Sequence, residues 1–276
     1  VLENNQAVAF TGGIPRDGLV FGQPEHMIQM GDVMVSKDVR GILSKKGPFY
    51  LASQHYLSSR VGPGLQYSLA FGFPNERACK VGVIRGIYNI VDNIIEPRWT
   101  PLHEDSMECQ HIQIIDPWLN EHWQQQVDTL WLHMKEDVNE VGIGIRNSQW
   151  IKHRYINKPK ANYLLALIND PQRHDQPIGL IILNIHAHGG IELLDIVGPR
   201  NSALTLIKAA RIITAHYKAP YLFAWATPSA LNWFENSHYH PHKTEVVIPG
   251  CNLNSPQHAL RIKNRWWLLG GDSDFR

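Results

Sequence analysis

The chain has 276 residues, and its 26 Lys and Arg against 25 Asp and Glu give a formal net charge of +1. Hydrophobic residues make up 43% and charged residues 18%, which is the composition of a globular protein and excludes an intrinsically disordered chain. A net charge so close to zero argues against a nucleic-acid binder that uses a broad basic face. At roughly 100–200 residues per domain, the length allows one large domain or two of ordinary size.

The cysteines and the apolar segments bear on where the protein works. Cys79, Cys109 and Cys251 are widely spaced and odd in number, and no pair forms a CxxC motif. This pattern favours reduced thiols over a disulfide framework. No apolar run approaches the roughly 18–20 residues of a membrane span, and no charged stretch followed by an apolar one opens the chain. We therefore expect a cytoplasmic protein with no membrane partner.

The first part of the chain predicts strands, a helix, and then strand, helix and strand. These elements are strands at residues 6–11 and 26–35, a helix at 50–59, a strand at 67–73, a helix at 75–83 and one long or two short strands at 88–99. Gly12, Gly13 and Pro15 are expected to end the first strand. Pro48 suits the first turn of the helix that follows, because its missing N–H would have no partner there.

Residues 97–115 show no sustained periodicity and contain Pro97, Pro101 and Asp105, which predicts a domain boundary near residue 105. Beyond it, apolar residues at helical spacing predict a helix over residues 116–137. The remaining predicted elements are a helix at 148–155, strands at 163–168, 179–185 and 191–197, a helix at 202–217, a strand at 221–225, a helix at 229–236, and strands at 243–248 and 266–269.

The two parts have nearly the same order of elements once the two leading helices of the second part are removed. We therefore expect an α/β protein made of two tandem copies of one unit, at residues 1–105 and 106–276. The first copy lacks the opening strand and the two helices.

The segment 31–41 is predicted to be a strand followed by a turn rich in backbone donors, and Lys45, Lys46 and Gly47 precede the helix that starts near Pro48. A helix N-terminus has unpaired N–H groups and a partial positive charge, so it favours a phosphate group. The pattern is neither GxGxxG nor GxxxxGKS/T, which argues against a Rossmann or P-loop nucleotide site. A pyrophosphate site and a plain surface loop with lysines both fit these residues.

A second segment contains Gly72-Phe-Pro-Asn75 and closes at Arg85-Gly-Ile-Tyr88. Together with Arg40-Gly41 and Gly47-Pro-Phe49, it resembles two motifs of the GNAT superfamily of acyl-CoA-dependent N-acyltransferases. In that family the first motif is a strand with a pyrophosphate-binding turn, and the second is a strand, an Asn and a short helix. The pattern is similar to that of a bacterial subgroup of two-domain GNAT proteins, and the specific likeness covers roughly residues 6–99.

The resemblance implies two GNAT-like domains, each a mixed, mostly antiparallel twisted sheet flanked by helices. It implies transfer of an acyl group, such as acetyl, from acyl-CoA to an amine of a small molecule, sugar or peptide by direct attack, with no metal and no nucleic-acid partner. The residues implied in acyl-CoA binding are Val33, Met34, Val35, Arg40, Gly41, Lys45, Lys46, Gly47, Pro48, Phe49 and Asn75. Asp32 is implied as the catalytic base and Tyr88 as an acid. Asp32 also fits a structural role, Asn75 a helix cap and Tyr88 a packing role.

Departures from the family pattern leave other functions open. Many relatives carry a Tyr seven residues after the motif Asn that protonates the leaving thiolate, and this position is Gly82 here. The matching turn of the second copy, residues 195–201, has one glycine, so we expect acyl-CoA at the first copy. The main alternative is a catalytically degenerate GNAT pair that acts as a ligand-binding or scaffold module. Histidines at 186, 188, 238, 240 and 242 leave a metal-dependent hydrolase as a third possibility.

Overall fold

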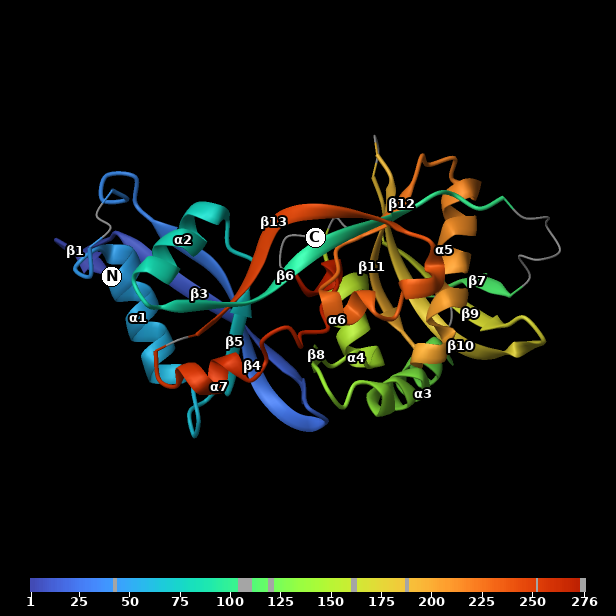
Figure 1. Ribbon diagram of the computed structural model, residues 1–276, viewed down its shortest axis with the longest axis horizontal. Coiled ribbons are helices and arrows are strands. Elements are labelled where there is room, and N and C mark those ends of the chain that lie inside the picture. Colours follow the sequence, from blue (N-terminus) through green and yellow to red (C-terminus); the bar gives the residue numbers. More distant parts are fainter. Residues whose placement is uncertain are drawn as a thin grey trace.

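The computed structural model describes residues 1–41, 44–103, 111–118, 122–159, 163–186, 189–251 and 253–273. The molecule is elongated, with the N-terminal half of the chain at one end and most of the C-terminal half at the other (Figure 1). Two long strands, β6 (Tyr88–Trp99) and β13 (His240–Cys251), run side by side between the halves and pair antiparallel.

The N-terminal half is built on a four-stranded sheet in the order β5-β4-β3-β8. These strands are β3 (Ala9–Val20), β4 (Gln23–Val35), β5 (Leu69–Gly72) and β8 (Gly142–Gly144). β3 and β4 form a long antiparallel hairpin, β5 lies parallel to β4, and β8 pairs with the end of β3. A separate small hairpin consists of β1 (Leu2–Glu3) and β2 (Gln6–Ala7).

The larger sheet has seven strands in the order β13-β6-β12-β11-β10-β9-β7. Besides β6 and β13, it contains β7 (Ile112–Ile114), β9 (Tyr163–Asp170), β10 (Arg173–Ile185), β11 (Ile191–Val197) and β12 (Leu222–Ala224). Its neighbouring strands are antiparallel except β11 and β12, which are parallel. Each of the two large sheets thus contains one parallel pair.

The helices follow local signals in the sequence. They are α1 (Pro48–Arg60), α2 (Glu76–Ile84), α3 (His122–Asp137), α4 (Ser148–Ile151), α5 (Ala203–His216), α6 (Pro228–Leu231) and α7 (Pro256–Leu260), and a π-helical turn at Lys152–Ile156 extends α4. Asn75 and Asn147 cap α2 and α4, because each side chain accepts a backbone N–H of the first turn. The buried residues of α3 recur at helical spacing and are Trp123, Val127, Leu130, Trp131 and Met134.

The same order of elements occurs twice along the chain. The run β3-β4-α1-β5-α2-β6 is matched by β10-β11-α5-β12-α6-β13, and the last strands of the two repeats pair with each other. This is the repeated α/β order that the sequence predicts, built on the mixed, mostly antiparallel sheets that the resemblance implies. The expected boundary at 105 falls within 104–110, outside the described residues, and each large sheet takes a strand from across it. The division at that residue therefore stays a prediction.

Several local features differ from the expectation; among them, the helix expected at 229–236 ends at Leu231, and β7 is a strand that the sequence did not predict. β3 does not end at Gly12 but extends to Val20, because β4 pairs with it along its length. Residues 266–269 form isolated bridges, from Trp266 to Gly142 and from Leu269 to Ala226, in place of a strand. β8 and α7 are too short, at three and five residues, for a periodic pattern to predict them.

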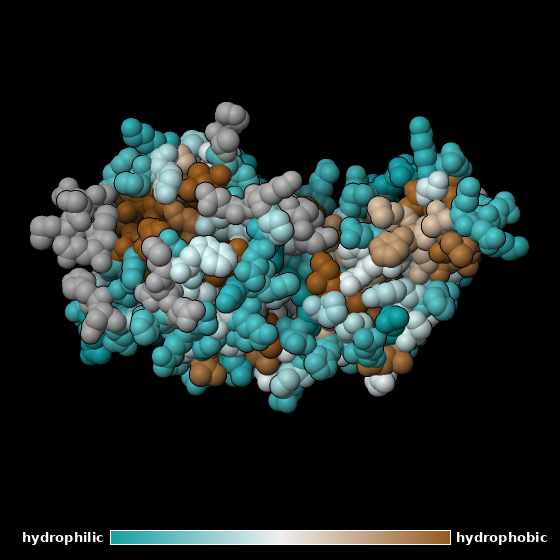
Figure 2. Space-filling model, turned by 180° about the vertical axis from the view of Figure 1, so that it is seen from behind, coloured by the Kyte–Doolittle hydropathy of each residue, from teal (hydrophilic) through white to brown (hydrophobic). Residues whose placement is uncertain are grey.

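Buried apolar side chains form three cores. The largest packs helices on the seven-stranded sheet and includes Trp123 and Trp267. A second core, with Phe71 and Trp266, joins the two halves, and a third surrounds Leu57 beside α1. The face opposite to that of Figure 1 is largely polar along its middle, and apolar side chains gather toward both ends (Figure 2). No helix in the described part of the chain is long and apolar enough to cross a membrane.

A buried ion cluster fixes the last described residues to the C-terminal half. Arg146 is 0% exposed, and its guanidinium donates to Asp195 at 2.8 Å and to Asp272 at 2.6 Å. The hydroxyl of Tyr155 donates to the second oxygen of Asp195 at 2.9 Å. Burial alone lowers the pKa of Arg146, but the two carboxylates raise it above its ordinary value. The cluster therefore holds Arg146 as a cation.

Arg146→Met should lower the free energy of unfolding by about 3–5 kcal/mol, because two buried carboxylates lose their shared cation. Arg211→Met is the control. The Arg211 guanidinium lies at the surface and donates to the carbonyl of Thr100 at 2.8 Å, so its loss should cost within about 0.5 kcal/mol. Chemical denaturation of both variants measures the difference, and equal losses would contradict the assignment.

Asp92 is a buried carboxylate at the junction of the halves. It lies on β6, is 3% exposed, and accepts the backbone N–H groups of Asn93 at 2.9 Å and Trp266 at 3.2 Å. Burial raises the pKa of Asp92 from 3.8 to about 6. The stability that this group contributes is therefore present in full below its unfolded pKa and is lost as the pH rises through about 6.

Asp92→Asn should remove this pH dependence. Relative to the wild type, the free energy of unfolding of the variant should rise by about 1–2 kcal/mol between about pH 5 and pH 8, because the ionised carboxylate is costly only in the folded protein. Urea unfolding at the two pH values measures the change. If the variant and the wild type differ in unfolding free energy by the same amount at both pH values, burial does not raise the pKa of Asp92.

Candidate functional site

The parallel strands β4 and β5 pair over a short stretch and then diverge. Their last paired residues are Met30 and Gly72. Beyond Gly72 the chain reaches Pro74, which has no N–H with which to continue the ladder. β4 runs on to Val35 and is paired there only with β3. A gap therefore opens between the two strands.

A β-bulge lies in β4 at the start of this gap. The register of the β3–β4 pair shifts between Phe10 and Gly12, so that Asp32 and Val33 together lie opposite one residue of β3. Asp32 has a φ of +48°, in the left-handed region that is costly for a residue with a side chain. A bulge leaves backbone groups of the extra residue outside the ladder. Backbone donors are thus directed away from β3 at the point where the strands part.

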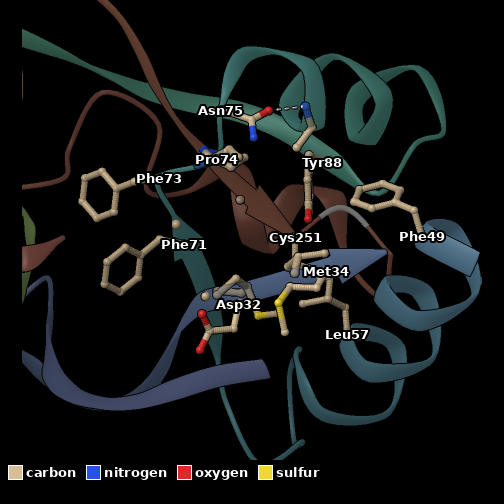
Figure 3. Close-up of a pocket in the computed structure, with 18 residues that line it drawn as sticks. Asp32, Met34, Phe49, Leu57, Phe71, Phe73, Pro74, Asn75, Tyr88 and Cys251 are labelled. Carbon is tan, nitrogen blue, oxygen red and sulfur yellow. Dashed lines mark hydrogen bonds between the residues drawn. The ribbon is translucent and has the colours of Figure 1, made fainter. Parts of the chain in front are cut away.

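A cavity of about 340 Å³ fills the gap, with walls from β4, β5, α1, α2, β6 and β13 (Figure 3). The Asp32 carboxylate lies on the side of Phe71, and Leu57 lies on the opposite side (Figure 3). Cys251, from the far end of the sequence, lies beside Tyr88. The walls are largely apolar with a few polar groups, which is typical of a small-molecule site.

A second cavity of about 520 Å³ adjoins the first on the side of the exposed Arg40. The residues that line both cavities are Val33, Met34, Phe49, Asn75 and Ala78. Arg40 donates to the carbonyl of Val35 at 3.1 Å, which closes the turn after β4. Arg77, from α2, is the other cation in this wall. The outer end of the combined space is therefore positively charged and the inner end is apolar.

The N-terminus of α1 lies at the outer cavity, because Phe49 of its first turn lines it. The N-cap is Gly47, which has no side chain to bond the first N–H groups, and the first turn contains no acidic residue. Pro48 follows in the first helical position. Unsatisfied N–H groups and the helix dipole favour an anion here. Five residues that the sequence predicts for acyl-CoA binding do not line either cavity. They are Gly41, Lys45, Lys46, Gly47 and Pro48, and they lie before or at the start of α1.

Asn75 is both a helix cap and part of the cavity wall. Its Oδ1 accepts the backbone N–H of Ala78 at 2.9 Å (Figure 3). This is the capping alternative that the sequence left open. The amide nitrogen of the side chain is not used by this bond and points toward the cavity in Figure 3. Asn75 can therefore cap α2 and still offer a donor to a ligand.

Tyr88 reaches the cavity from β6, and its hydroxyl points toward Cys251 (Figure 3). Its ring packs on α2 at Gly82, where an added Cβ would overlap the ring. The residue is 7% exposed, and burial raises the pKa of the hydroxyl to about 12. The hydroxyl is thus protonated at neutral pH. The glycine at the position of the family tyrosine makes room for a tyrosine from the next strand.

The corresponding gap of the second repeat is filled by the chain itself. β11 and β12 form a short parallel pair like that of β4 and β5. Just beyond it, Ala226 bridges to Leu269, so the C-terminal segment enters where the strands diverge. Gly270 lies against Leu194 of β11 and Trp225 after β12. The ion cluster around Arg146 holds this segment in place between the two strands.

A carboxylate from the end of α3 lies at the turn after β11. The backbone N–H of Arg200, at the start of the helical segment before α5, donates to Asp137 at 2.7 Å. Glu136 and Glu235 line the same surface. An incoming phosphate would therefore meet negative charge at the position where α1 offers free N–H groups. The two repeats differ in this respect, because the turn of the first is lined by cations and the surface at the turn of the second carries three carboxylates beside Arg200.

Several wall residues are absent from the sequence-based set. Arg77 and Ala78 follow the motif Asn on the predicted helix, so their position next to Asn75 could have marked them. Leu57 lies further along α1. Residues 249–251 come from β13, and no local pattern connects them with β4 because only the sheet brings them together.

The histidines form no metal site among the residues that the structure describes, where no group of three or more His, Cys, Asp or Glu side chains could hold an ion. Nε2 of His186 lies 3.1 Å from Oε2 of Glu192. His188 and Cys109 lie outside the described residues.

No family model matches the sequence, and no curated protein matches it. Solved structures match it in fold. A conserved protein of unknown function and probable N-acyltransferase from Enterococcus faecalis V583 aligns with a TM-score of 0.62 at 13% identity, over 91% of this chain and 61% of that one. A GCN5-related N-acetyltransferase from Anabaena variabilis ATCC 29413 gives 0.61 at 12% identity, with coverages of 91% and 61%. N-myristoyltransferase from Saccharomyces cerevisiae with bound myristoyl-CoA gives 0.56 at 13% identity, with coverages of 95% and 72%.

This chain spans 61% of the length of the first two of these proteins. At identities of 12–13%, what they share with it is the fold. The TM-scores of 0.56–0.62, over more than 90% of this chain, show that the protein has the GNAT fold.

Proposed function

We propose that the protein is an acyl-CoA-dependent N-acyltransferase that moves an acyl group, with acetyl as the first to test, to an amine of a small molecule, sugar or peptide. The observation that carries the proposal is the open gap between β4 and β5, apolar inside and cationic at its outer end. An acyl-CoA has the matching form, because it joins an anionic pyrophosphate to a long, weakly polar arm. The yeast protein of similar fold binds myristoyl-CoA, which supports this class of donor.

In this proposal the donor lies along β4. The pyrophosphate is held by the N-terminus of α1 and by Arg40, with Lys45 and Lys46 adding positive charge on the loop before the helix. The pantetheine arm runs beside the backbone of Val33 to Val35. The free amide nitrogen of Asn75 donates to the arm from the other wall.

The backbone of the bulge and the side chains of Asp32 and Tyr88 carry out the acyl transfer in this proposal. The Asp32 carboxylate takes one proton from the acceptor ammonium, and the neutral amine nitrogen then attacks the thioester carbonyl carbon. The carbon–sulfur bond breaks, and the second proton of the nitrogen passes to the sulfur, so that CoA leaves as a thiol. Backbone N–H groups of the bulge hold the carbonyl oxygen as it gains negative charge. The Tyr88 hydroxyl donates a hydrogen bond to the leaving sulfur. Positioning of the two substrates supplies most of the remaining rate.

A ligand-binding module without catalysis is the alternative, and Gly82 at the position of the family tyrosine favours it. The two functions are separated by calorimetry with acetyl-CoA followed by a thiol-release assay over a panel of amines. Binding with thiol release supports the enzyme, and binding without it supports the module. No binding to acetyl-CoA would contradict both.

Arg40→Ala should weaken acetyl-CoA binding by about tenfold, because one guanidinium–phosphate contact is lost. Arg200→Ala is the matched control. It removes an arginine from the equivalent turn of the second repeat, where Asp137 already occupies the N–H of the turn, so the affinity should stay the same. Calorimetry measures both. Equal weakening in the two variants would mean that the donor is not held at the first repeat.

Tyr88→Phe should lower kcat by about 10–100-fold with little change in acetyl-CoA affinity, because the hydroxyl acts on the leaving sulfur in the transition state. Tyr67→Phe is the control. Tyr67 is buried in the same core, and its hydroxyl accepts a hydrogen bond from Gln66 at 3.1 Å without lining the cavity. Steady-state thiol release separates kcat from KM. An unchanged kcat in Tyr88→Phe would remove this residue from the mechanism.

A further inference from the structure

A third cavity, of about 270 Å³, lies between β3 of the first repeat and α4 of the second. It is separate from the gap between β4 and β5, and the two share none of their described lining residues. Its polar walls include Arg16, Asn147, Gln149 and His153. Trp150 provides an aromatic wall.

Arg16 is a buried cation in the wall of this cavity, and the protein satisfies only part of its hydrogen-bonding capacity. It is 7% exposed, and its guanidinium carbon lies over the ring of Trp150, 3.9 Å from the ring centroid. Nη2 donates to the backbone carbonyl of Asp272 at 3.1 Å. Within the described part of the chain, Nε and Nη1 have no hydrogen-bond acceptor. A buried guanidinium therefore keeps an edge available to a ligand.

The protein neutralises this cation only in part. The carboxylate of Asp272 is 3.9 Å from Arg16 and is already bonded to Arg146 at 2.6 Å. Burial lowers the pKa of Arg16 to about 10, and the pull of Asp272 does not offset it. An anion beside Arg16 would supply the missing interaction.

The chemistry of the walls favours a carboxylate over a phosphate. A guanidinium edge matches the two oxygens of a carboxylate, and such paired hydrogen bonds are strong. The described lining holds no Lys and no second Arg, and it does hold Asp17 and Asp272. A doubly charged phosphate would be poorly neutralised there, whereas a singly charged carboxylate needs one cation.

The cavity lies on the face of the β3–β4 pair that carries Asp32. Arg16 pairs directly with Met27, whose side chain belongs to the same core as Phe71. Figure 3 places the Asp32 carboxylate on the side of Phe71, away from Leu57 and α1. From Met27 to Gly31, next to Asp32, β4 rises by about 13 Å. A ligand held at Arg16 would therefore need an extended form to place an amine at the bulge.

We propose that Arg16 and Trp150 form a carboxylate-recognition subsite for the acceptor, and that the acceptor is an extended amine ending in a carboxylate, such as a short peptide. This inference rests on the proposed function for the role of the amine. The subsite itself is a statement about binding and can be tested without acyl transfer.

The test uses the full chain with tetraglycine and with tetraglycine amide, which differ at the carboxylate. Calorimetry should show that tetraglycine binds at least about tenfold more tightly than the amide, and that this preference disappears in Arg16→Met. Arg16→Lys keeps the charge but not the two-nitrogen edge, so it should lose most of the preference. Arg265→Met is the matched control, because Arg265 also covers an aromatic ring, Phe21 at 5.4 Å, on the protein surface.

Each outcome of these titrations either supports or overturns the carboxylate subsite at Arg16. Loss of the preference in both Arg16 variants but not in Arg265→Met supports the subsite. Equal binding of the two peptides by the wild type, or no binding of either, overturns it. If Arg16→Met does not fold, as judged by its thermal transition, Arg16→Lys alone carries the comparison. Acetyl-CoA titration of the same samples keeps the tests separate, because a protein that binds tetraglycine but not acetyl-CoA refutes the proposed function and leaves the subsite standing.

Discussion

Two parallel strands that diverge leave backbone N–H and C=O groups that have to find partners away from the ladder. This constraint arises twice in the protein, between β4 and β5 and between β11 and β12. The second gap is closed by the C-terminal segment, which the buried Arg146 holds through Asp195 and Asp272. The first remains as a cavity of about 340 Å³. The proposed function depends on this difference, because the same fold offers a ligand site only where the chain has not filled it.

The C-terminal segment also connects the closed gap with the acceptor side of the open one. The carboxylate of Asp272 is bonded to Arg146, and its carbonyl accepts from Arg16 of β3. One short piece of chain thus contacts both repeats. Together with the β6–β13 pair and the core around Trp266, it fixes how the halves meet. The suggested path of the acceptor runs along this junction, so the geometry of the site and the stability of the junction are linked.

Tyr88 places a phenol hydroxyl in the cavity, although the sequence position at which the family carries its tyrosine is occupied by Gly82. The family position is Gly82, which by itself suggests that the group is lost. A side chain there would overlap the ring of Tyr88, which brings a hydroxyl into the cavity from β6. Burial keeps that hydroxyl protonated, since it raises the pKa to about 12.

The sequence by itself determined the element order, the repeat, and the local site features that lie close together in the chain. The strand and turn up to Arg40 and the Asn75 cap are examples, because turns, caps and short-range periodicity depend on neighbouring residues. Only the tertiary structure decided which repeat is open, because that depends on residues 266–272 entering one gap and on Asp137 meeting the turn at Arg200. It also brought residues 249–251 to the cavity wall and Arg16 to Trp150. These contacts join segments that lie from about forty to more than a hundred residues apart. Sheet pairing and buried charge bring the segments together, and no local sequence pattern records either.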